Sequence, residues 1–517
     1  MKKLLVTLLA LLMAFTLVGC SNKTDDAPKD DAGTATEAKD EVNLCITMAL
    51  STTDPWANRA VQDLCVLNQV YEGLLFYNDL TQEFEYRVAE DYELSEDGKT
   101  YTFKINPNAK FHNGDPVKAS DVVFSFDRTN ANASTSNFMA GVNEYKAIDD
   151  LKVEITLDSP SVPFMSSLVQ IPIASEKVVT EQGDEFGSKI ALAGTGPYYF
   201  TSLDQDVAWT LEAFPDYYRG EATIKKINYR PITDSSAALL AMQSGELDYL
   251  QLTSTTGFDT LQANSNFNTE CIAANHITFL CIDANVQGPM ADKRVRQAIA
   301  WCLDKDAMNQ AAFGNLGTVA THMENPVYNA GAPEGGIVYS YNPDKAKELL
   351  AEAGYADGVN IGKLLSFTGS QFEKCAQISQ ANMAAVGIEC EIEWNEQATC
   401  IARWNSADFQ ITTSGWPSTY DYDSFRNRWD SRTNTGFSDF GASPIDTSEW
   451  ERLIDESAKE QDPIKRKEIN QQVNDMIMEE AVFIPLLHKA IPCVWVKNLN
   501  VVNRPGYYYV YEWSYNN

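Results

Sequence analysis

The chain has 517 residues, of which 44% are hydrophobic and 22% charged, and its formal net charge is −32. This length allows two or three domains, and the apolar content is that of an ordinary globular protein. So acidic a chain disfavours nucleic acid and other polyanions and suits cationic or zwitterionic ligands, although solubility alone explains most of the charge. We therefore expect no nucleic-acid partner.

The first twenty residues predict export from the cytoplasm. A basic head at Lys2 and Lys3 precedes a charge-free apolar run over residues 4–18, which is too short to cross a bilayer comfortably. The run ends in Leu-Val-Gly-Cys20, which resembles the bacterial lipobox and implies cleavage before Cys20 and lipidation of its thiol. We interpret residues 1–19 as a lipoprotein signal peptide; the alternative is an ordinary signal peptide whose cysteine is incidental.

Residues 20–40 predict a flexible tether. After Cys20 they include no aromatic or large aliphatic residue, so they cannot bury apolar surface. Twenty such residues have an end-to-end distance of roughly 25 Å. One fatty chain holds a protein to a membrane only marginally, so stable attachment requires a multiply acylated Cys20. We expect a protein body anchored by lipid at the outer face of the cell membrane.

Cysteine and histidine usage argues against a metal site. No Cys-x-x-Cys occurs, no Cys/His group has zinc-site spacing, and the four histidines are scattered, so we expect no metal and no cofactor. Nine cysteines follow Cys20, and an odd number cannot all pair internally. Several of them replace aliphatic residues in apolar patterns, which favours buried free thiols. Cys271 and Cys281 flank an expected strand-turn-strand and are the best candidate disulfide pair.

The first half of the chain contains well-patterned strands and a glycine break. Tyr101, Phe103 and Ile105 alternate with polar residues, as a half-buried strand requires. A helix is expected to open at residue 119. The segment Gly194-Thr-Gly196 breaks the chain, and we expect its two glycines to provide backbone geometry that needs positive φ.

The second half alternates strands with helices. We expect a βαβ unit over residues 227–252. A later helix starts at Pro343, where proline fits the first turn, and stops at Gly354. From residue 361 to 415 strands and helices alternate, which indicates an α/β sheet covered on both faces. Ligands of such sheets bind at strand ends, which directs attention to the loop that begins at Trp416.

Nine motifs occur in a fixed order across nearly all of the chain after the tether. They are Tyr71-Glu-Gly-Leu74, Leu94-Ser-Glu-Asp-Gly-Lys-Thr-Tyr-Thr-Phe103, Phe111-His-Asn-Gly-Asp115, Ala119-Ser-Asp-Val-Val-Phe-Ser-Phe126, Gly194-Thr-Gly-Pro-Tyr198, Gln243-Ser-Gly-Glu-Leu-Asp248, Arg294-Val-Arg-Gln-Ala-Ile299, Lys345-Ala-Lys-Glu-Leu-Leu-Ala-Glu-Ala-Gly354 and Ser414-Gly-Trp416. Each motif alone is weak. Together they resemble the extracellular solute-binding proteins of peptide ABC importers, the group of oligopeptide- and dipeptide-binding proteins.

The resemblance implies a two-lobed α/β fold of the type II periplasmic-binding-protein class, with an extra subdomain inserted in the first lobe. Lobe I would comprise residues 41–84, 194–273 and 482–517, and lobe II residues 274–481. The inserted subdomain would be residues 85–193. Hinge strands would connect the lobes, and a ligand would be buried between them.

The site residues follow from the same resemblance and from the strand-end position. Many peptide-binding members carry an Asp three residues after the Trp of the Ser-Gly-Trp loop, and this Asp pairs with the ligand amine. This chain has Thr419 there, so Asp421 or Asp423 could supply the carboxylate from a shifted loop. Otherwise the ligand lacks a free amine, or both acids are solvated.

Four further residues complete the candidate ligand contacts. Trp416 either stacks on the ligand or plugs the interface between the lobes, and Tyr420 lies beside the two loop acids. Tyr71 and Glu72 end an early strand and are candidates for the cleft wall, while simple packing is the alternative for Tyr71.

The function implied by the resemblance is an extracellular receptor that captures short peptides between its lobes. It would act as a monomer, deliver the peptide to the permease and ATPase subunits of an ABC importer, and need no catalytic residue. Oligosaccharides, nickel chelates and haem are alternative ligands in the same role. A secreted hydrolase is the alternative from another class; the Gly-x-Ser-x-Gly, His-Glu-x-x-His and Cys-His signatures are missing, but carboxylate-pair hydrolysis stays open.

Overall fold

One mixed sheet of eleven strands runs through both lobes. The computed structural model describes residues 39–57, 60–204, 207–252, 255, 257–283, 285, 288–323, 335–417, 429–432 and 443–516. The sheet has the strand order β15-β14-β16-β12-β17-β11-β1-β10-β9-β8, and β13 pairs with β17 beside this path. Its strands are β1 Glu41–Ile46, β8 Tyr198–Asp204, β9 Ala208–Ala213, β10 Lys226–Pro231, β11 Tyr249–Gln251, β12 Phe267–Ile282, β13 Thr318–Val319, β14 Val359–Phe367, β15 Ile388–Asn395, β16 Ile411–Pro417 and β17 Phe483–Val496.

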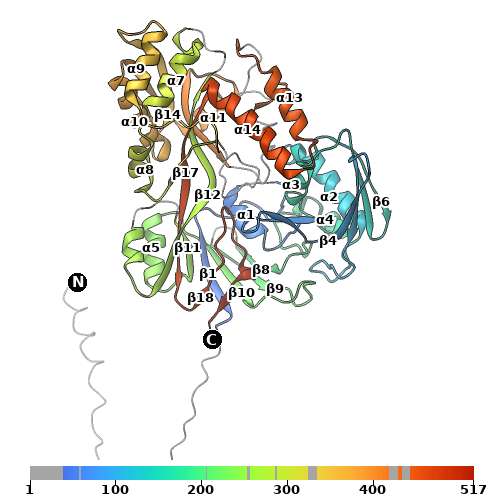
Figure 1. Cartoon of the computed structure of the whole chain (residues 1–517). Helices are drawn as coiled ribbons and strands as arrows, with labels where there is room; N and C mark the ends of the chain where they lie inside the picture. The colour runs from blue at the N-terminus through green and yellow to red at the C-terminus, as the bar shows by residue number, and fades with distance from the viewer. Residues whose placement is uncertain are drawn as a thin grey trace, which may run out of the picture. The chain divides into compact units, whose positions relative to one another are not determined.

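Two long antiparallel strands, β12 and β17, belong to both lobes (Figure 1). Residues 267–273 of β12 pair with residues 490–496 of β17, and residues 277–281 pair with residues 483–488. Between these two ladders, residues 274–276 lie opposite the single residue Lys489. Such a β-bulge bends and twists the strand pair locally. It marks the point where the sheet passes from one lobe to the other.

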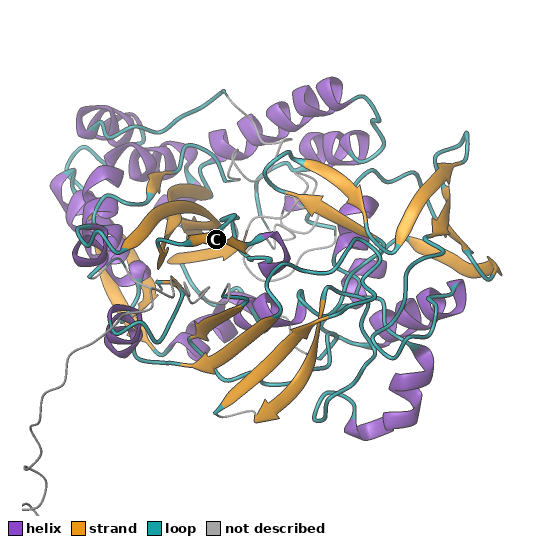
Figure 2. Ribbon diagram, turned by 90° about the horizontal axis from the view of Figure 1, so that it is seen from below, coloured by secondary structure: helices purple, strands orange, loops and turns teal. Residues whose placement is uncertain are grey.

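Helices cover both faces of the lobe II part of the sheet, as the sequence predicts (Figures 1 and 2). One core holds Leu280 and Ile299, and a second core holds Phe279 and Trp404. Because the neighbours Phe279 and Leu280 enter different cores, β12 is buried on both faces. The helices are α7 Lys293–Cys302, α8 Lys305–Phe313, α9 Pro343–Glu352 and α10 Gln371–Ala385 on one face, and α11 Gln397–Asn405, α13 Ser448–Ser457 and α14 Pro463–Glu480 on the other. None of the helices in the described ranges is long and apolar enough to cross a membrane.

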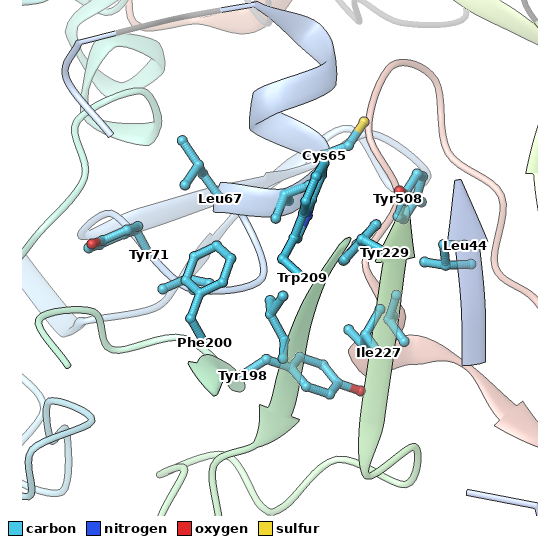
Figure 3. Packing of buried hydrophobic residues seen from close by; sticks show 14 of the residues in the cluster. Leu44, Cys65, Leu67, Tyr71, Tyr198, Phe200, Trp209, Ile227, Tyr229 and Tyr508 are labelled. Atoms are coloured by element: carbon cyan, nitrogen blue, oxygen red, sulfur yellow. The ribbon is translucent and has the colours of Figure 1, made fainter. Parts of the chain in front are cut away.

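The lobe I strands pack on a core rich in aromatic side chains (Figure 3). Trp209 of β9 and Tyr229 of β10 are buried there and stack with ring centroids 6.4 Å apart. Cys65 and Leu67 enter the same core from α1 Val61–Leu67. The other elements of this lobe are α5 Ser235–Gln243, α6 Phe258–Gln262, the strand pair β2 Leu75–Asn78 and β3 Glu83–Tyr86, and the strand pair β18 Leu499–Asn500 and β19 Ser514–Tyr515.

The segment between residues 85 and 193 contains a second sheet with its own core. The strand order is β4-β5-β7-β6. Tyr101, Phe103 and Ile105 of β5 are buried against Phe126 of α2, which confirms the predicted alternating strand and the helix expected from residue 119. The elements are β4 Ala89–Leu94, β5 Thr100–Ile105, α2 Ala119–Ala131, β6 Val142–Asp149, β7 Lys152–Leu157, α3 Phe164–Val169 and α4 Glu176–Gln182.

Two further predictions are confirmed, one of them with a difference. β10, α5 and β11 follow in the predicted βαβ order, and the Asp234 carboxylate caps α5 by accepting from the backbone N–H of Ala237 at 2.8 Å. β1 lies between β10 and β11 and runs parallel to both, so the two strands of this unit are not neighbours. α9 begins at Pro343, and Gly354 follows its end with a φ of 92°.

The predicted Cys271–Cys281 disulfide is wrong. Both cysteines lie on the single continuous strand β12 rather than on two strands joined by a turn. Ten residues of extended chain separate their Cα atoms by roughly 30 Å, far beyond the reach of a disulfide. Every described cysteine is a free thiol, and among them Cys271 alone is exposed. Burial raises the pKa of Cys65 to about 12, so this thiol stays protonated.

Candidate functional site

The carboxyl ends of the parallel strands in both lobes point toward the bulge between β12 and β17. In lobe II, β16 runs antiparallel to β12 and ends at Pro417, opposite His276, and β14 and β15 run parallel to β16. In lobe I, β11 runs antiparallel to β17 and ends at Gln251, opposite Cys493, and β1 runs parallel to β11. Ligands of open α/β sheets bind outside the carboxyl ends of the strands. In both lobes, the strand ends at which ligands of such sheets bind therefore face the bulge between β12 and β17.

Trp416 stands at the carboxyl end of β16, where the sequence places it. Its ring centroid lies 4.1 Å from that of Phe279 and 5.6 Å from that of Phe483, so aromatic packing fixes one side of the indole. The side chain of Trp416 is nevertheless partly exposed. The residue before Trp416 has to be glycine, because a Cβ at Gly415 would lie only 2.5 Å from the carbonyl oxygen of Ile277. The geometry leaves Trp416 able to contact a ligand and to close the second core of lobe II.

The loop after Trp416 carries the other lobe II candidates. Thr419, Tyr420, Asp421 and Asp423 lie outside the described residues, which end at Pro417 and resume at residue 429. Their assignment as contacts for the ligand stays a prediction.

Tyr71 and Glu72 line a cavity of about 250 Å³ in lobe I. Its wall includes Arg87 and Arg219, together with four tyrosines besides Tyr71. Tyr71 is 6% exposed and lies at the border of the lobe I core, with its hydroxyl directed away from the other labelled side chains (Figure 3). The wall takes its residues from the segments 55–87, 169–172, 197–219 and 507–512 and none from residues 274–481. Among the described residues, this cavity and Trp416 therefore do not share a wall.

The carboxylate of Glu72 already has a full set of partners. The hydroxyl of Tyr217 donates to Oε1 at 2.8 Å, and the hydroxyl of Tyr218 donates to Oε2 at 3.0 Å. Thr195 donates to Oε2 at 3.3 Å, and the Nε atom of Arg87 lies 3.7 Å from Oε1. Burial raises the pKa of Glu72, and Arg87 and the tyrosine hydroxyls partly oppose this rise. Glu72 thus ties three distant segments together at the cavity wall.

The glycines of two motifs permit close backbone approach at this wall. A Cβ at Gly73 would lie 2.9 Å from the carbonyl oxygen of Leu168, and a Cβ at Gly196 would lie 2.6 Å from that of Gln69. The expectation of positive φ at Gly194 and Gly196 is wrong, because neither residue has it. Both need glycine since the backbone of the segment after α1 lies directly against them.

A second cavity, which the sequence analysis missed, lies beside the bulge between the lobes. It has a volume of about 350 Å³ and is lined by the end of α8, the start of α10, Thr255 beyond β11, and Lys489 and Ala490 of β17. We refer to it as the hinge cavity. The one feature of the sequence that could have indicated this cavity is Lys489, which stands shortly after the apolar run at residues 482–487.

Two buried basic side chains lie near the cavity, Lys305 at the start of α8 and His488 on β17. Lys305 is 5% exposed and donates to the carbonyl oxygen of Ala320 at 3.2 Å; burial lowers its pKa to about 7. Burial also lowers the pKa of His488 to about 4, helped by the positive charges of His322 and Lys305. Within the described ranges, no three His, Cys, Asp or Glu side chains are arranged to hold a metal ion.

The sequence profile of the bacterial extracellular solute-binding proteins, family 5 (middle part), matches residues 83–437. The chain belongs to this family. The resemblance predicted from the motifs is therefore confirmed, and the chain is a substrate-binding component of an ABC importer. Its relatives are solute-binding proteins rather than enzymes.

Individual family members give the degree of similarity. A glutathione-binding protein, GsiB, from Pectobacterium atrosepticum is 30% identical over 370 residues, which cover 69% of each chain. The structure of HbpA2 from Haemophilus parasuis has a TM-score of 0.82 at 24% identity and covers 92% of this chain and 99% of that one. DppA from Helicobacter pylori, in complex with the peptide STSA, has a TM-score of 0.76 at 21% identity and covers 93% and 99%. These matches confirm the two-lobed α/β fold class.

Proposed function

We propose that this family 5 protein captures short peptides between its two lobes while a lipid on Cys20 anchors it at the outer face of the cell membrane. The observation that carries the proposal is the arrangement of the two sets of parallel strands, whose carboxyl ends face the hinge bulge from both sides. The permease and ATPase subunits of the importer would take the ligand from the closed form. Residues 41–84, 194–273 and 482–517 form lobe I in this proposal, residues 274–481 form lobe II, and residues 85–193 the inserted subdomain.

The chemistry of a peptide suits this place. Its main chain offers donors and acceptors along an extended line, so a strand edge can bind it without regard to sequence. Its charged amine needs a paired carboxylate once it leaves bulk water. A relative is named for glutathione binding, and a structural neighbour holds the peptide STSA. Glutathione and short linear peptides are therefore the first ligands to test.

Each candidate residue has a defined role in the proposal. Trp416 packs against the ligand from the end of β16, and the loop behind it supplies the carboxylate of Asp421 or Asp423 to the amine, with Thr419 and Tyr420 alongside. Tyr71 and Glu72 form the lobe I wall. Because both oxygens of Glu72 already accept hydrogen bonds, this side chain would shape the wall rather than bind the amine.

Mass spectrometry of molecules that co-purify with the protein tests the ligand class directly. We expect peptides that are returned unchanged after incubation, whereas turnover would favour a secreted hydrolase. Recovery of an oligosaccharide, a nickel chelate or haem instead would keep the transport role and overturn the peptide assignment.

Titration with peptides that differ only at the amine tests the loop acids. Asp421→Asn is expected to weaken free-amine peptides by about tenfold and to leave N-acetylated peptides unchanged, because one charge-assisted hydrogen bond is lost. Asp423→Asn serves as the matched alternative. Equal losses for both peptides would remove the acids from the site.

Replacement of Cys20 tests the anchor. Cys20→Ser should release the protein from the membrane fraction into the soluble fraction, since the tether itself buries no apolar surface. Unchanged membrane association in this variant would contradict the proposed lipid attachment.

A further inference from the structure

The cavity lined by Tyr71 and Glu72 has mostly aromatic walls, and we refer to it as the aromatic cavity. Its lining contains five tyrosines, one phenylalanine and three prolines. The rings of Phe76 and Tyr509 meet edge to face with centroids 5.1 Å apart. Two further rings of the lining, those of Tyr217 and Tyr511, meet in the same way at 5.2 Å. Because such contacts fix the orientation of each ring, the walls are in place before a ligand binds.

The acids of this lining are already compensated, so the cavity suits a neutral ligand. The lining holds two acids besides Glu72. Glu85 accepts from Arg87 at 3.0 Å, and the two oxygens of Glu512 each accept from Arg504 at 2.7 Å. A charged ligand would therefore leave water without gaining a free counter-ion from these acids, which is unfavourable.

Tyr71 brings a hydroxyl group to the cavity that has no hydrogen-bond partner among the described residues. Its side chain is 6% exposed, and the hydroxyl is directed away from the labelled core side chains (Figure 3). Burial raises the pKa of Tyr71, so the hydroxyl keeps its proton. Tyrosine hydroxyls that are removed from water normally have a partner. The side-chain amide of Asn68, in the same lining, also has none among the described residues, so both groups can bind a molecule from outside the chain.

We propose that the aromatic cavity binds a neutral aromatic ring that carries a hydroxyl or a ring N–H, with Tyr71 as its hydrogen-bond partner. The cavity volume of about 250 Å³ exceeds the roughly 150 Å³ that hold benzene in a protein interior, so a phenol or indole ring fits. Arg219 of the lining is exposed, so the cavity reaches the surface on that side. A free phenol or indole supplies such a ring, and so does the tyrosine or tryptophan side chain of a peptide. The second source rests on the proposed peptide-binding function.

Free ring compounds test the site without any peptide. Ligand-observed NMR titrations would compare p-cresol with toluene on the wild type and on Tyr71→Phe. We expect the wild type to bind p-cresol about fivefold more tightly than toluene, since one hydrogen bond is gained. Tyr71→Phe should abolish this preference and change the affinity for toluene by less than about twofold. Tyr101→Phe, which removes a buried hydroxyl outside the cavity, is the matched control and should keep the preference.

Peptides distinguish the two sources of the ring. If a peptide supplies it, Ala-Tyr-Ala should bind about fivefold more tightly than Ala-Phe-Ala, p-cresol should compete, and Tyr71→Phe should equalise the two peptides. Saturable p-cresol binding with equal peptide affinities would assign the cavity to a free ring.

Two results would overturn the aromatic site. One is no saturable p-cresol binding together with equal affinities for the two peptides, and the other is a preference for the hydroxylated ring that persists in Tyr71→Phe. If the wild type binds no peptide at all, the proposed function fails, and the comparison of p-cresol with toluene still decides the cavity.

Discussion

Glu72 and Lys489 are two ionisable side chains that the fold removes from water, and their surroundings differ. Glu72 in lobe I has hydrogen bonds from three hydroxyl groups and a guanidinium at 3.7 Å. Lys489 at the hinge has no partner among the described residues, although burial lowers its pKa. The acid is held by groups of the fold itself, whereas the base has no such partner among the described residues.

This difference separates a charge that the fold compensates with its own groups from a charge that it leaves without a counter-ion. A buried charge that is fully hydrogen-bonded by other groups of the protein favours the one arrangement of those groups that makes these bonds. A buried charge without a hydrogen-bond partner or counter-ion lowers the free energy of unfolding. The free energy of unfolding should therefore respond in opposite ways when the charge is removed at the two places.

Removal of the Glu72 carboxylate should have the largest effect on stability. Glu72→Leu leaves the hydroxyls of Tyr217, Tyr218 and Thr195 without their acceptor in a buried place, so we expect a loss of about 3 kcal/mol in the free energy of unfolding. Urea unfolding measures it. Glu93→Leu, at an exposed position of β4, is the control and should cost less than about 0.5 kcal/mol. A loss below about 1 kcal/mol for Glu72→Leu would contradict the structural role.

Lys305 extends the comparison to a cation that is almost fully buried. Removal of its charge should raise the free energy of unfolding, whereas removal of the Glu72 carboxylate should lower it. Its pKa falls to about 7 in the folded protein, so below that pH the folded state keeps a buried charge at a cost. Between pH 7 and the ordinary lysine pKa of about 10.4, the unfolded chain binds the proton more tightly, and wild-type stability should rise with pH. Lys305→Met should therefore be more stable than the wild type by about 2 kcal/mol near pH 7.

The pH dependence is the decisive part of this prediction. The advantage of Lys305→Met should shrink as the pH is raised from 7 to 10, which urea midpoints at several pH values would show. A difference that stays constant over this range would mean that the ammonium of Lys305 is not the cause.

Single hydroxyl deletions around Glu72 should cost less than removal of the acid. Tyr217→Phe and Tyr218→Phe each lose one hydrogen bond to the carboxylate, and we expect about 1 kcal/mol for each. In the background of Glu72→Leu the same substitutions should cost nothing, because the acceptor is already gone. Additive losses in this double-mutant cycle would show that the tyrosines act independently of Glu72.

The smallest effect on stability is expected at the hinge cavity. Lys489→Met should change the free energy of unfolding by less than about 0.5 kcal/mol, with a gain rather than a loss, since no contact of the fold is removed. A loss of more than about 1 kcal/mol would place Lys489 in the scaffold beside Glu72 and remove the contrast between the two regions.

The sequence predicted most of the fold because its signals were local. The alternation of Tyr101, Phe103 and Ile105, the proline that opens α9 and the glycine that follows it are set within one or two turns of chain. The position of Trp416 at a strand end followed from the same local patterns. The β12 strand was divided wrongly because a turn was expected between Cys271 and Cys281, whereas the chain continues as one strand through the bulge at residues 274–276.

The sites themselves depend on contacts between distant segments, which no local pattern encodes. The three hydroxyl groups that donate to Glu72 are 123 to 146 positions away along the chain. The glycines near residue 195 were explained by positive φ, but their reason is the backbone packed against them. Lys489 stands out only after Glu373, the acid in the lining of the same cavity, has been placed and found to accept hydrogen bonds from Gly369 and Gln377.

The bulge between β12 and β17 has a consequence for how a peptide would be taken up. A rotation of the lobes about these strands would displace each atom in proportion to its distance from that axis. Lys489 lies in the bulge between the two ladders, so its backbone would move little in such a rotation while the outer walls would travel furthest. Contacts made at the bulge in an open form would therefore persist as the walls approach, whereas contacts on the outer walls would form only on closure.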